Sequence, residues 1–202
     1  MAKKSVINEL VKVYAEATKE IIEANTGSAI SFSKTALKIP QVYLKPDIGC
    51  FVELTGDFEG LIIMNFSKEA ALEIYKKYMT LIGMPEDEIA ENYTSKEVAD
   101  SIGEIVNQIA GKARQTFEKN FGIVVKINQP KAIVISSTIM MSIAADIVKP
   151  QNRRISFRTE SKNPFYAEIS IEQTEFVNLF NGTNAEEEEE ELDIDKLLEM
   201  NQ

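Results

Sequence analysis

The chain has 202 residues, enough for one domain of about 150–180 residues with appendages but not for two large domains. Apolar residues make up 44%, which is ordinary for a globular protein with a buried core. The absence of histidine and the single cysteine exclude histidine-based triads, His or Cys-cluster metal sites and internal disulfides. We expect Cys50 to be a small buried apolar residue.

The net charge of −10 is unevenly distributed along the chain. Residues 186–202 hold nine acidic residues and one lysine, a net charge of −8, whereas residues 1–185 hold 23 acidic and 21 basic residues. A body without a basic surplus argues against a nucleic-acid partner. The first residues carry no apolar signal-peptide segment, and the longest uncharged run, 132–145, is too short to span a bilayer. We therefore expect a cytoplasmic protein without membrane insertion.

The first half of the chain has the pattern of a helix, several strands and a second helix. Apolar residues spaced three and four apart predict a helix over 5–25. Four apolar segments predict strands, at residues 29–33, 41–44, 50–54 and 60–66. A turn at 56–60 joins the last two. Ser67 is the expected N-cap of a helix that continues to about Leu81.

After a loop or short helix at 85–93, the second half repeats this order. A third helix is expected from near Thr94 to about Lys119, with Thr94 and Glu97 as a capping box. Strands are then predicted at residues 123–127, 132–136, within 139–148, 154–159 and 166–171. The basic cluster at 149–154 is interpreted as a solvated turn. We expect a domain over 1–180 and a flexible acidic tail over 181–202.

The two halves resemble each other. Each has a helix that ends at a glycine, Gly27 or Gly122, followed by a strand and then by a proline, Pro40 or Pro130. This echo predicts an internal repeat with pseudo-two-fold symmetry. The expected fold class is α+β in two layers, with a mainly antiparallel sheet and two long helices packed on one of its faces.

The third predicted helix carries a polar stripe opposite its core face. The core face collects apolar residues, namely Ile102, Ile105, Val106, Ile109 and Ala113. The stripe consists of Asp100, Glu104, Asn107 and Gly111. Every amphipathic helix has a solvated face, and that interpretation stays open. However, asparagine and glycine are both unfavourable inside a helix, so their presence favours contact with a partner.

The pattern Asp100-x3-Glu104-x2-Asn107, followed by Pro130, resembles the signature of the CheX/CheC/FliY chemotaxis phosphatases, and most closely a CheX-like member. The segments 102–111 and 54–60 are also similar to that family. The resemblance covers residues 5–172. It implies a phosphatase that acts on a phosphorylated response regulator similar to CheY, which carries an acyl phosphate on an aspartate.

The resemblance also implies roles for individual residues. Glu104 and Asn107 would be catalytic: Asn107 would position the attacking water, as a glutamine does in small GTPases, and Glu104 would hold the register by pairing with a lysine of the regulator. Asp100 and Gly111 would contact the partner, and Pro130 would be structural. The chain would need no cofactor of its own, because the regulator supplies Mg²⁺. CheX-like members also imply a homodimer.

The number of sites follows from the repeat. Aligning Gly27 with Gly122 places Ser5, Glu9 and Lys12 over Asp100, Glu104 and Asn107. Lysine cannot accept a hydrogen bond from water. We therefore predict one working site per chain, with Glu9 and Lys12 as an exposed helix pair in the alternative interpretation.

The acidic tail ends in a short motif. Residues 192–198 resemble the acidic peptide by which flagellar switch proteins capture phosphorylated CheY. Ile194, Leu197 and Leu198 have helical spacing and would present an apolar face to a groove of the regulator. A disordered, solubilising tail is the alternative.

Two further interpretations of the whole chain stay open. One is a non-catalytic module that binds a receiver domain without hydrolysis. The other is a dimeric adaptor in which an edge strand, such as 132–136, pairs across a two-fold axis. The water-positioning amide of Asn107 favours the enzyme.

Overall fold

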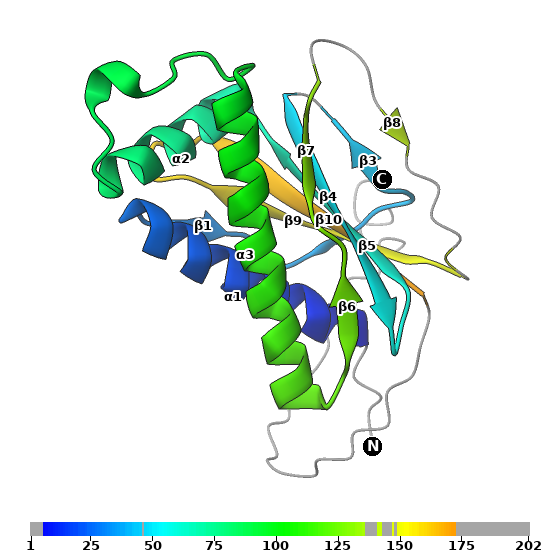
Figure 1. Cartoon of the computed structure of the whole chain (residues 1–202). Helices are drawn as coiled ribbons and strands as arrows, with labels where there is room; N and C mark the ends of the chain where they lie inside the picture. The colour runs from blue at the N-terminus through cyan, green and yellow to red at the C-terminus, as the bar shows by residue number, and fades with distance from the viewer. Residues whose placement is uncertain (1–5, 46, 136–140, 143–146, 148, 173–202) are drawn as a thin grey trace, which may run out of the picture.

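The computed structural model describes residues 6–45, 47–135, 141–142, 147 and 149–172 (Figure 1). The helices are α1 (Val6–Thr26), α2 (Lys68–Leu81), the 3-10 turn η1 (Glu86–Glu88) and α3 (Lys96–Phe121). The strands of the first half are β1 (Ser31–Phe32), β2 (Leu37–Lys38), β3 (Tyr43–Leu44), β4 (Ile48–Gly56) and β5 (Gly60–Phe66). Those of the second half are β6 (Val125–Ile127), β7 (Lys131–Val134), β8 (Met141–Ser142), β9 (Gln151–Arg158) and β10 (Pro164–Ile171).

The two halves of the chain interleave in one antiparallel sheet. Within the described residues its order is β1-β9-β10-β5-β4-β6, with β2 also pairing with β9 and β7 also pairing with β4. The hairpins β4–β5 and β9–β10 therefore meet at the centre, and each receives two short strands from the other half. β3 and β8 pair with each other. This exchange is the predicted pseudo-two-fold repeat, and the α+β fold class is confirmed.

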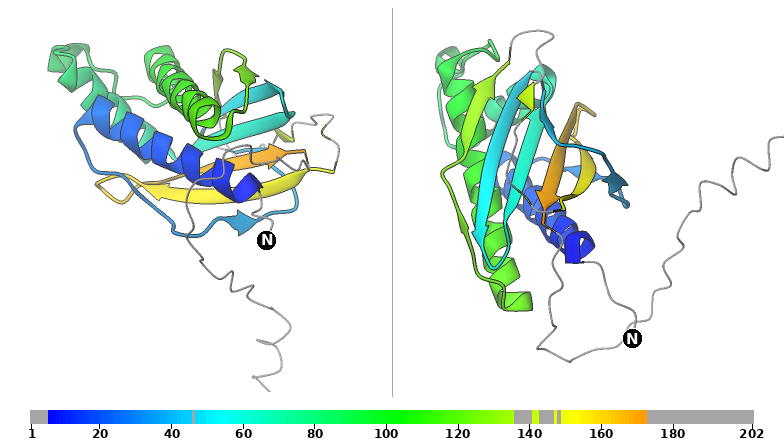
Figure 2. Two further views of the ribbon diagram at one scale, coloured as in Figure 1. Left: turned by 90° about the horizontal axis from the view of Figure 1, so that it is seen from below. Right: turned by 90° about the vertical axis from the view of Figure 1, so that its right-hand side faces the viewer.

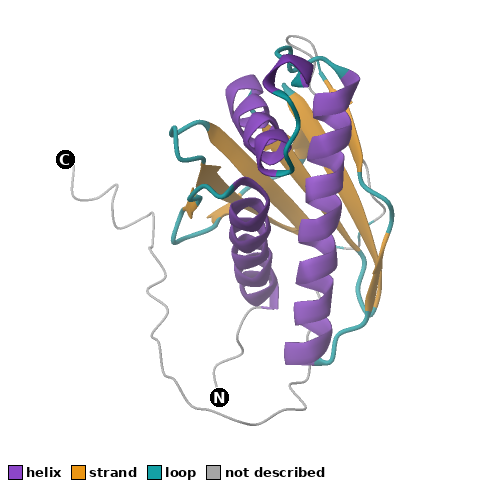
Figure 3. Ribbon diagram, turned by 60° about the vertical axis from the view of Figure 1, so that its left-hand side comes forward, coloured by secondary structure: helices purple, strands orange, loops and turns teal. Residues whose placement is uncertain are grey.

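All three α-helices lie on one face of the sheet, as two directions of view show (Figures 2 and 3). Their apolar stripes and the inward side chains of the strands form the main core. Three aromatic rings stack along the central strands: Phe66 on Phe165 at 5.2 Å between centroids, and Phe165 on Phe157 at 4.9 Å. None of the described helices is long and apolar enough to cross a membrane.

The opposite face of the sheet has its own small apolar cluster, formed by Val42, Leu44, Leu61, Ile63 and Ile135. Because β5 is covered on both faces, all seven of its residues are buried, and its sequence is apolar from Gly60 to Met64 without alternation. Glu168 is also buried on this side. Arg154 donates to its Oε1 from Nη2 at 2.6 Å and from Nε at 3.0 Å. The solvated turn expected at 149–154 is thus wrong for residues 151–153, which already lie in β9, whereas Arg154 lies in a strand as predicted. Arg154 neutralises the buried carboxylate.

Several predicted boundaries need correction. β5 and the C-terminus of α2 lie at the predicted residues, and Ser67 caps α2 by accepting from the Ala70 N–H. Ser95, not Thr94, caps α3, accepting from the Val98 N–H at 3.4 Å. The strand β2 was not predicted.

The two prolines of the predicted repeat are not equivalent. Pro40 follows β2, whereas Pro130 precedes β7. The glycines at the helix ends are a better guide. Gly122 ends α3 in the left-handed conformation, with φ +67°. Gly27 follows the end of α1 with φ +64°.

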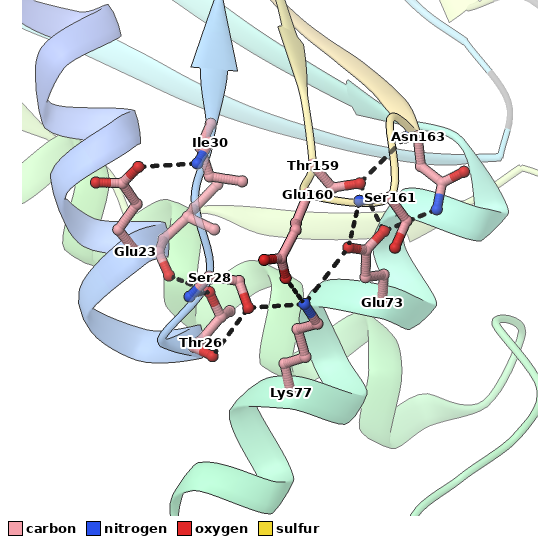
Figure 4. Close-up of polar contacts among 11 residues, drawn as sticks. Glu23, Thr26, Ser28, Ile30, Glu73, Lys77, Thr159, Glu160, Ser161 and Asn163 are labelled. Carbon is pink, nitrogen blue, oxygen red and sulfur yellow. Dashed lines mark hydrogen bonds and ion pairs between the residues drawn. The ribbon is translucent and has the colours of Figure 1, made fainter.

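A polar network ties α2 to the β9–β10 turn (Figure 4). The Glu73 carboxylate accepts from Thr159 Oγ1 at 2.5 Å, Asn163 Nδ2 at 2.7 Å and the Ser161 N–H at 3.1 Å. Burial raises the pKa of Glu73, but the hydrogen bonds together outweigh it, so its pKa lies below the usual 4.5.

The same network reaches the end of α1 through Lys77 (Figure 4). Lys77 Nζ donates to Ser28 Oγ at 2.7 Å and pairs with Glu160 at 2.5 Å. Nearby, the Ile30 N–H donates to Glu23 Oε1 at 2.8 Å. The network thus fixes the chain where α1 turns into β1.

Candidate functional site

Helix α3 positions the predicted stripe. Its core face is fully buried, with Ile102, Ile105, Val106 and Ile109 each at 0% exposure. This burial fixes the rotation of the helix about its axis. The stripe therefore points away from the core: Asp100 and Glu104 are exposed, while Asn107 and Gly111 are partly buried.

A cleft of about 550 Å³ opens between α3 and the segment that enters β7. In Figure 1 this segment and β7 lie alongside α3. The α3 wall consists of Ala99, Asp100, Gly103, Glu104 and Asn107. The opposite wall consists of Phe51, Gln129, Pro130, Lys131, Ala132 and Ile133. The fold thus brings Asp100, Glu104, Asn107 and Pro130, which are separated in sequence, to one place.

Asn107 has an amide that is free to meet a partner. In the described part of the chain its side chain makes no hydrogen bond to another residue. A carboxamide can donate to one group and accept from another at the same time. At the edge of a cleft, such a group can bridge a bound anion and a water molecule.

Glu104 is held from within the helix. Its Oε1 accepts from Gln108 Nε2, four residues later, at 3.3 Å. Because the carboxylate is solvent-exposed, it also remains accessible to a cation from outside the chain.

Asp100 lies at the N-terminal end of the cleft and already has a partner. Lys96, one turn earlier, forms an ion pair with it, and the hydrogen bond that Lys96 donates to Asp100 raises the pKa of Lys96. An exposed pair of this kind contributes little to stability. A contact of Asp100 with another protein would therefore involve the pair as a whole.

Gly111 lies outside the cleft, one turn beyond Asn107. A Cβ at this position would meet no atom within 4 Å, so nothing in the described fold requires glycine there. Its predicted contact with a partner stays a prediction.

Residues on the far wall were not found from the sequence. Lys131 brings a positive charge and Gln129 an amide to the cleft, and Phe51 comes from the adjacent strand β4. The proximity of Gln129 and Lys131 to Pro130 was the available signal. Pro130 itself is buried between β6 and β7, and its predicted structural role stays a prediction.

Other predicted residues lie elsewhere. Ile194, Leu197 and Leu198 of the tail motif are outside the described residues, as is Ser5. Glu9 and Lys12 lie on α1, where Glu9 is partly buried and Lys12 exposed. Cys50 is fully buried as predicted, and burial raises the pKa of its thiol to about 12, so that it is protonated at neutral pH.

Among the described residues, no group of three or more Asp, Glu, Cys or His side chains is arranged to hold a metal ion. The cleft contains two acidic residues, Asp100 and Glu104. Lys131 lines the same cleft, and Lys96 forms an ion pair with Asp100.

A family described as "Protein of unknown function (DUF3334)" matches residues 3–202. The chain belongs to this family. No curated protein matches the DUF3334 chain. The match includes the acidic tail as well as the domain.

Solved structures show the same fold. A chemotaxis protein CheX from Desulfovibrio desulfuricans superposes with a TM-score of 0.68 at 21% identity, over 81% of this chain and 99% of that one. CheX from Vibrio vulnificus gives a TM-score of 0.64 at 17% identity, over 81% and 99%. CheX in the CheX–CheY–BeF₃–Mg²⁺ complex from Borrelia burgdorferi gives 0.58 at 21% identity, over 81% and 97%. The predicted likeness to CheX-like proteins is thereby confirmed for the fold.

Proposed function

We propose that this chain dephosphorylates a phosphorylated response regulator similar to CheY. The observation that carries the proposal is the position of Glu104 and Asn107 on the same polar stripe of α3, at a cleft whose other wall contains the Pro130 segment. The fold shared with a CheX that binds CheY in a complex with BeF₃ and Mg²⁺ supports it.

Hydrolysis of an acyl phosphate requires few catalytic groups from the phosphatase. In an acyl phosphate, water attacks phosphorus, the bond from phosphorus to the acyl oxygen breaks, and a carboxylate leaves with the electron pair. A carboxylate is a good leaving group, so no acid has to protonate it. The water proton passes to the phosphate product or to solvent. What must be supplied is a water molecule held in line with the bond that breaks.

Asn107 can hold that water. Its amide oxygen accepts a hydrogen bond from the water, and its NH₂ group donates to the phosphoryl group. The side chain lies at the edge of the cleft, where it is partly buried, and no described residue forms a hydrogen bond with it that would compete with the water. It is too weak a base to remove a proton, so its contribution is orientation.

Glu104 holds the register between the two proteins. It lies one turn before Asn107 on the same face, and its exposed carboxylate can pair with a lysine of the receiver. Asp100 and Gly111 extend the contact along α3. Mg²⁺ comes with the receiver, and the proposed chemistry requires no metal ligand from this chain.

The tail and the homodimer are further parts of the proposal. Ile194, Leu197 and Leu198 would capture the receiver and raise its concentration near α3. For the dimer, β7 lies at an edge of the described sheet, which is the position that strand pairing across a two-fold axis requires. Sedimentation equilibrium measures this association directly.

The function is tested by phosphate release from several CheY-like receivers, phosphorylated by a small-molecule donor with Mg²⁺, with and without this protein. Faster release that is lost in Glu104→Ala supports the proposal. If no receiver responds although one binds, the non-catalytic receiver-binding module becomes the better account.

A further inference from the structure

A hydrogen-bonded relay leads from α1 to the Glu104 carboxylate. Asn25, in the last turn of α1, donates from Nδ2 to Gln108 Oε1 at 2.8 Å. Gln108 donates from Nε2 to Glu104 Oε1 at 3.3 Å. We propose that Asn25 and Gln108 are positioning residues, which hold Glu104 in the orientation that meets a receiver. The inference rests on the proposed function of the cleft.

The direction of the relay follows from the chemistry of its ends. A carboxylate only accepts hydrogen bonds, so Gln108 must turn its NH₂ group toward Glu104. The Gln108 oxygen then points the other way, where it needs a donor, and the Asn25 NH₂ group supplies one. Reversing either amide would place two acceptors or two donors face to face.

The relay joins an exposed carboxylate to two partly buried amides. Glu104 is exposed, whereas Gln108 and Asn25 are partly buried between the helices. A free glutamate side chain samples several rotamers, and ordering it on binding costs free energy. A hydrogen bond from a partly buried amide reduces that cost, because the carboxylate is already oriented before the receiver arrives.

Asn25 is itself well anchored. Thr26, the next residue, donates from Oγ1 to the Ile22 carbonyl at 2.7 Å, and Glu23 accepts from the Ile30 N–H. The end of α1 is thus fixed on both sides of Asn25. Through Gln108, this anchored end of α1 restricts the orientation of Glu104 on α3.

The chain also offers a matched control. Glu20 and Lys112 form a second bridge between α1 and α3, at 2.6 Å between Oε1 and Nζ. It lies one turn further along α3 from Gln108 and has no contact with Glu104 among the described side chains. Breaking it loosens the helix pair without disturbing the relay.

The test measures the Kd for a receiver loaded with BeF₃⁻ and Mg²⁺. Gln108→Met removes the amide at similar length and should raise Kd about fivefold. Asn25→Asp should raise it as well, because an aspartate attracts the Gln108 NH₂ group and turns its oxygen toward Glu104. Glu20→Gln should leave Kd within about twofold.

A purely structural role is separated by a double-mutant cycle. In a Glu104→Ala background, Gln108→Met should change Kd no further. An undiminished effect in that background, or an equal loss of affinity in Glu20→Gln, would overturn the inference.

The side-chain amide resonance of Gln108 provides a readout without any receiver. It should shift in Glu104→Ala and in Asn25→Asp, but not in Glu20→Gln. If the wild-type protein binds no receiver, the proposed function is contradicted but the relay is not. The Gln108 amide resonance then tests the relay by itself, and a resonance that does not shift in Glu104→Ala refutes it.

Discussion

Gly111→Ala should stabilise the protein while weakening its proposed contact with a receiver. Gly111 lies inside α3, four residues after Asn107. Glycine costs about 1 kcal/mol relative to alanine in a helix interior. A methyl group at this position meets no atom within 4 Å, so no clash offsets the gain. The free energy of unfolding should rise by about 1 kcal/mol, and Tm by about 3 °C for a chain of this size.

Binding should change in the opposite direction. If the backbone of a receiver comes close to Gly111, the added methyl group displaces it, at a cost of about 1–2 kcal/mol. The apparent KM for dephosphorylation should then rise about tenfold. Thermal unfolding by circular dichroism measures the first effect, and phosphate release over a range of receiver concentrations measures the second.

Gln115→Ala is the control, because Gln115 is exposed and lies one turn further along α3. It should change neither quantity appreciably. Two results would refute the reasoning. Loss of stability in Gly111→Ala would contradict the open space around this residue. An unchanged KM in Gly111→Ala, together with higher stability, would show that Gly111 does not contact the receiver.

Three further predictions concern stability and the tail. Tyr14→Phe should raise the free energy of unfolding by about 1 kcal/mol in chemical denaturation, because the Tyr14 hydroxyl is buried with no hydrogen-bond partner in the described structure; a loss of stability would indicate an unseen partner. Glu73→Gln should cost about 2 kcal/mol at pH 7, measured by urea titration. Since the folded-state pKa of Glu73 lies below 4.5, this difference should persist above pH 4.5 and shrink as the pH falls through the folded-state pKa; a difference independent of pH would contradict the assignment. Deleting residues 182–202 should raise the KM for the receiver with little change in kcat; an unchanged KM would exclude capture by the tail.

The fold was predictable where one physical signal dominates. The 3.6-residue periodicity of α3 identifies the core face that the structure buries, and the apolar run of β5 marks a strand covered on both sides. β2 gives no such signal, because its two residues, Leu37 and Lys38, are both exposed and pair with β9 only through the tertiary fold. Ser95 and Thr94 both carry a hydroxyl group that can cap a helix, and the structure shows that Ser95 does so.

The residues that line the candidate cleft were predictable on one wall and not on the other. Glu104 and Asn107 lie on a helix, whose geometry relates neighbours three residues apart. Lys131 faces them because β7 pairs with β4 beside α3, a relation between segments that no local pattern encodes. The relay to Glu104 was predictable only in part. Gln108 is a neighbour of Glu104 on the same helix, but Asn25 is 83 residues away from Gln108 in sequence.

The central claim is that Asn107 positions the attacking water. The most direct measurement is the single-turnover rate of dephosphorylation of a receiver at saturating phosphatase, compared between the wild-type protein and Asn107→Ala. Our account predicts that the variant loses about a hundredfold of the acceleration while its Kd for the BeF₃⁻-loaded receiver stays within about threefold. Acceleration retained in Asn107→Ala would contradict it.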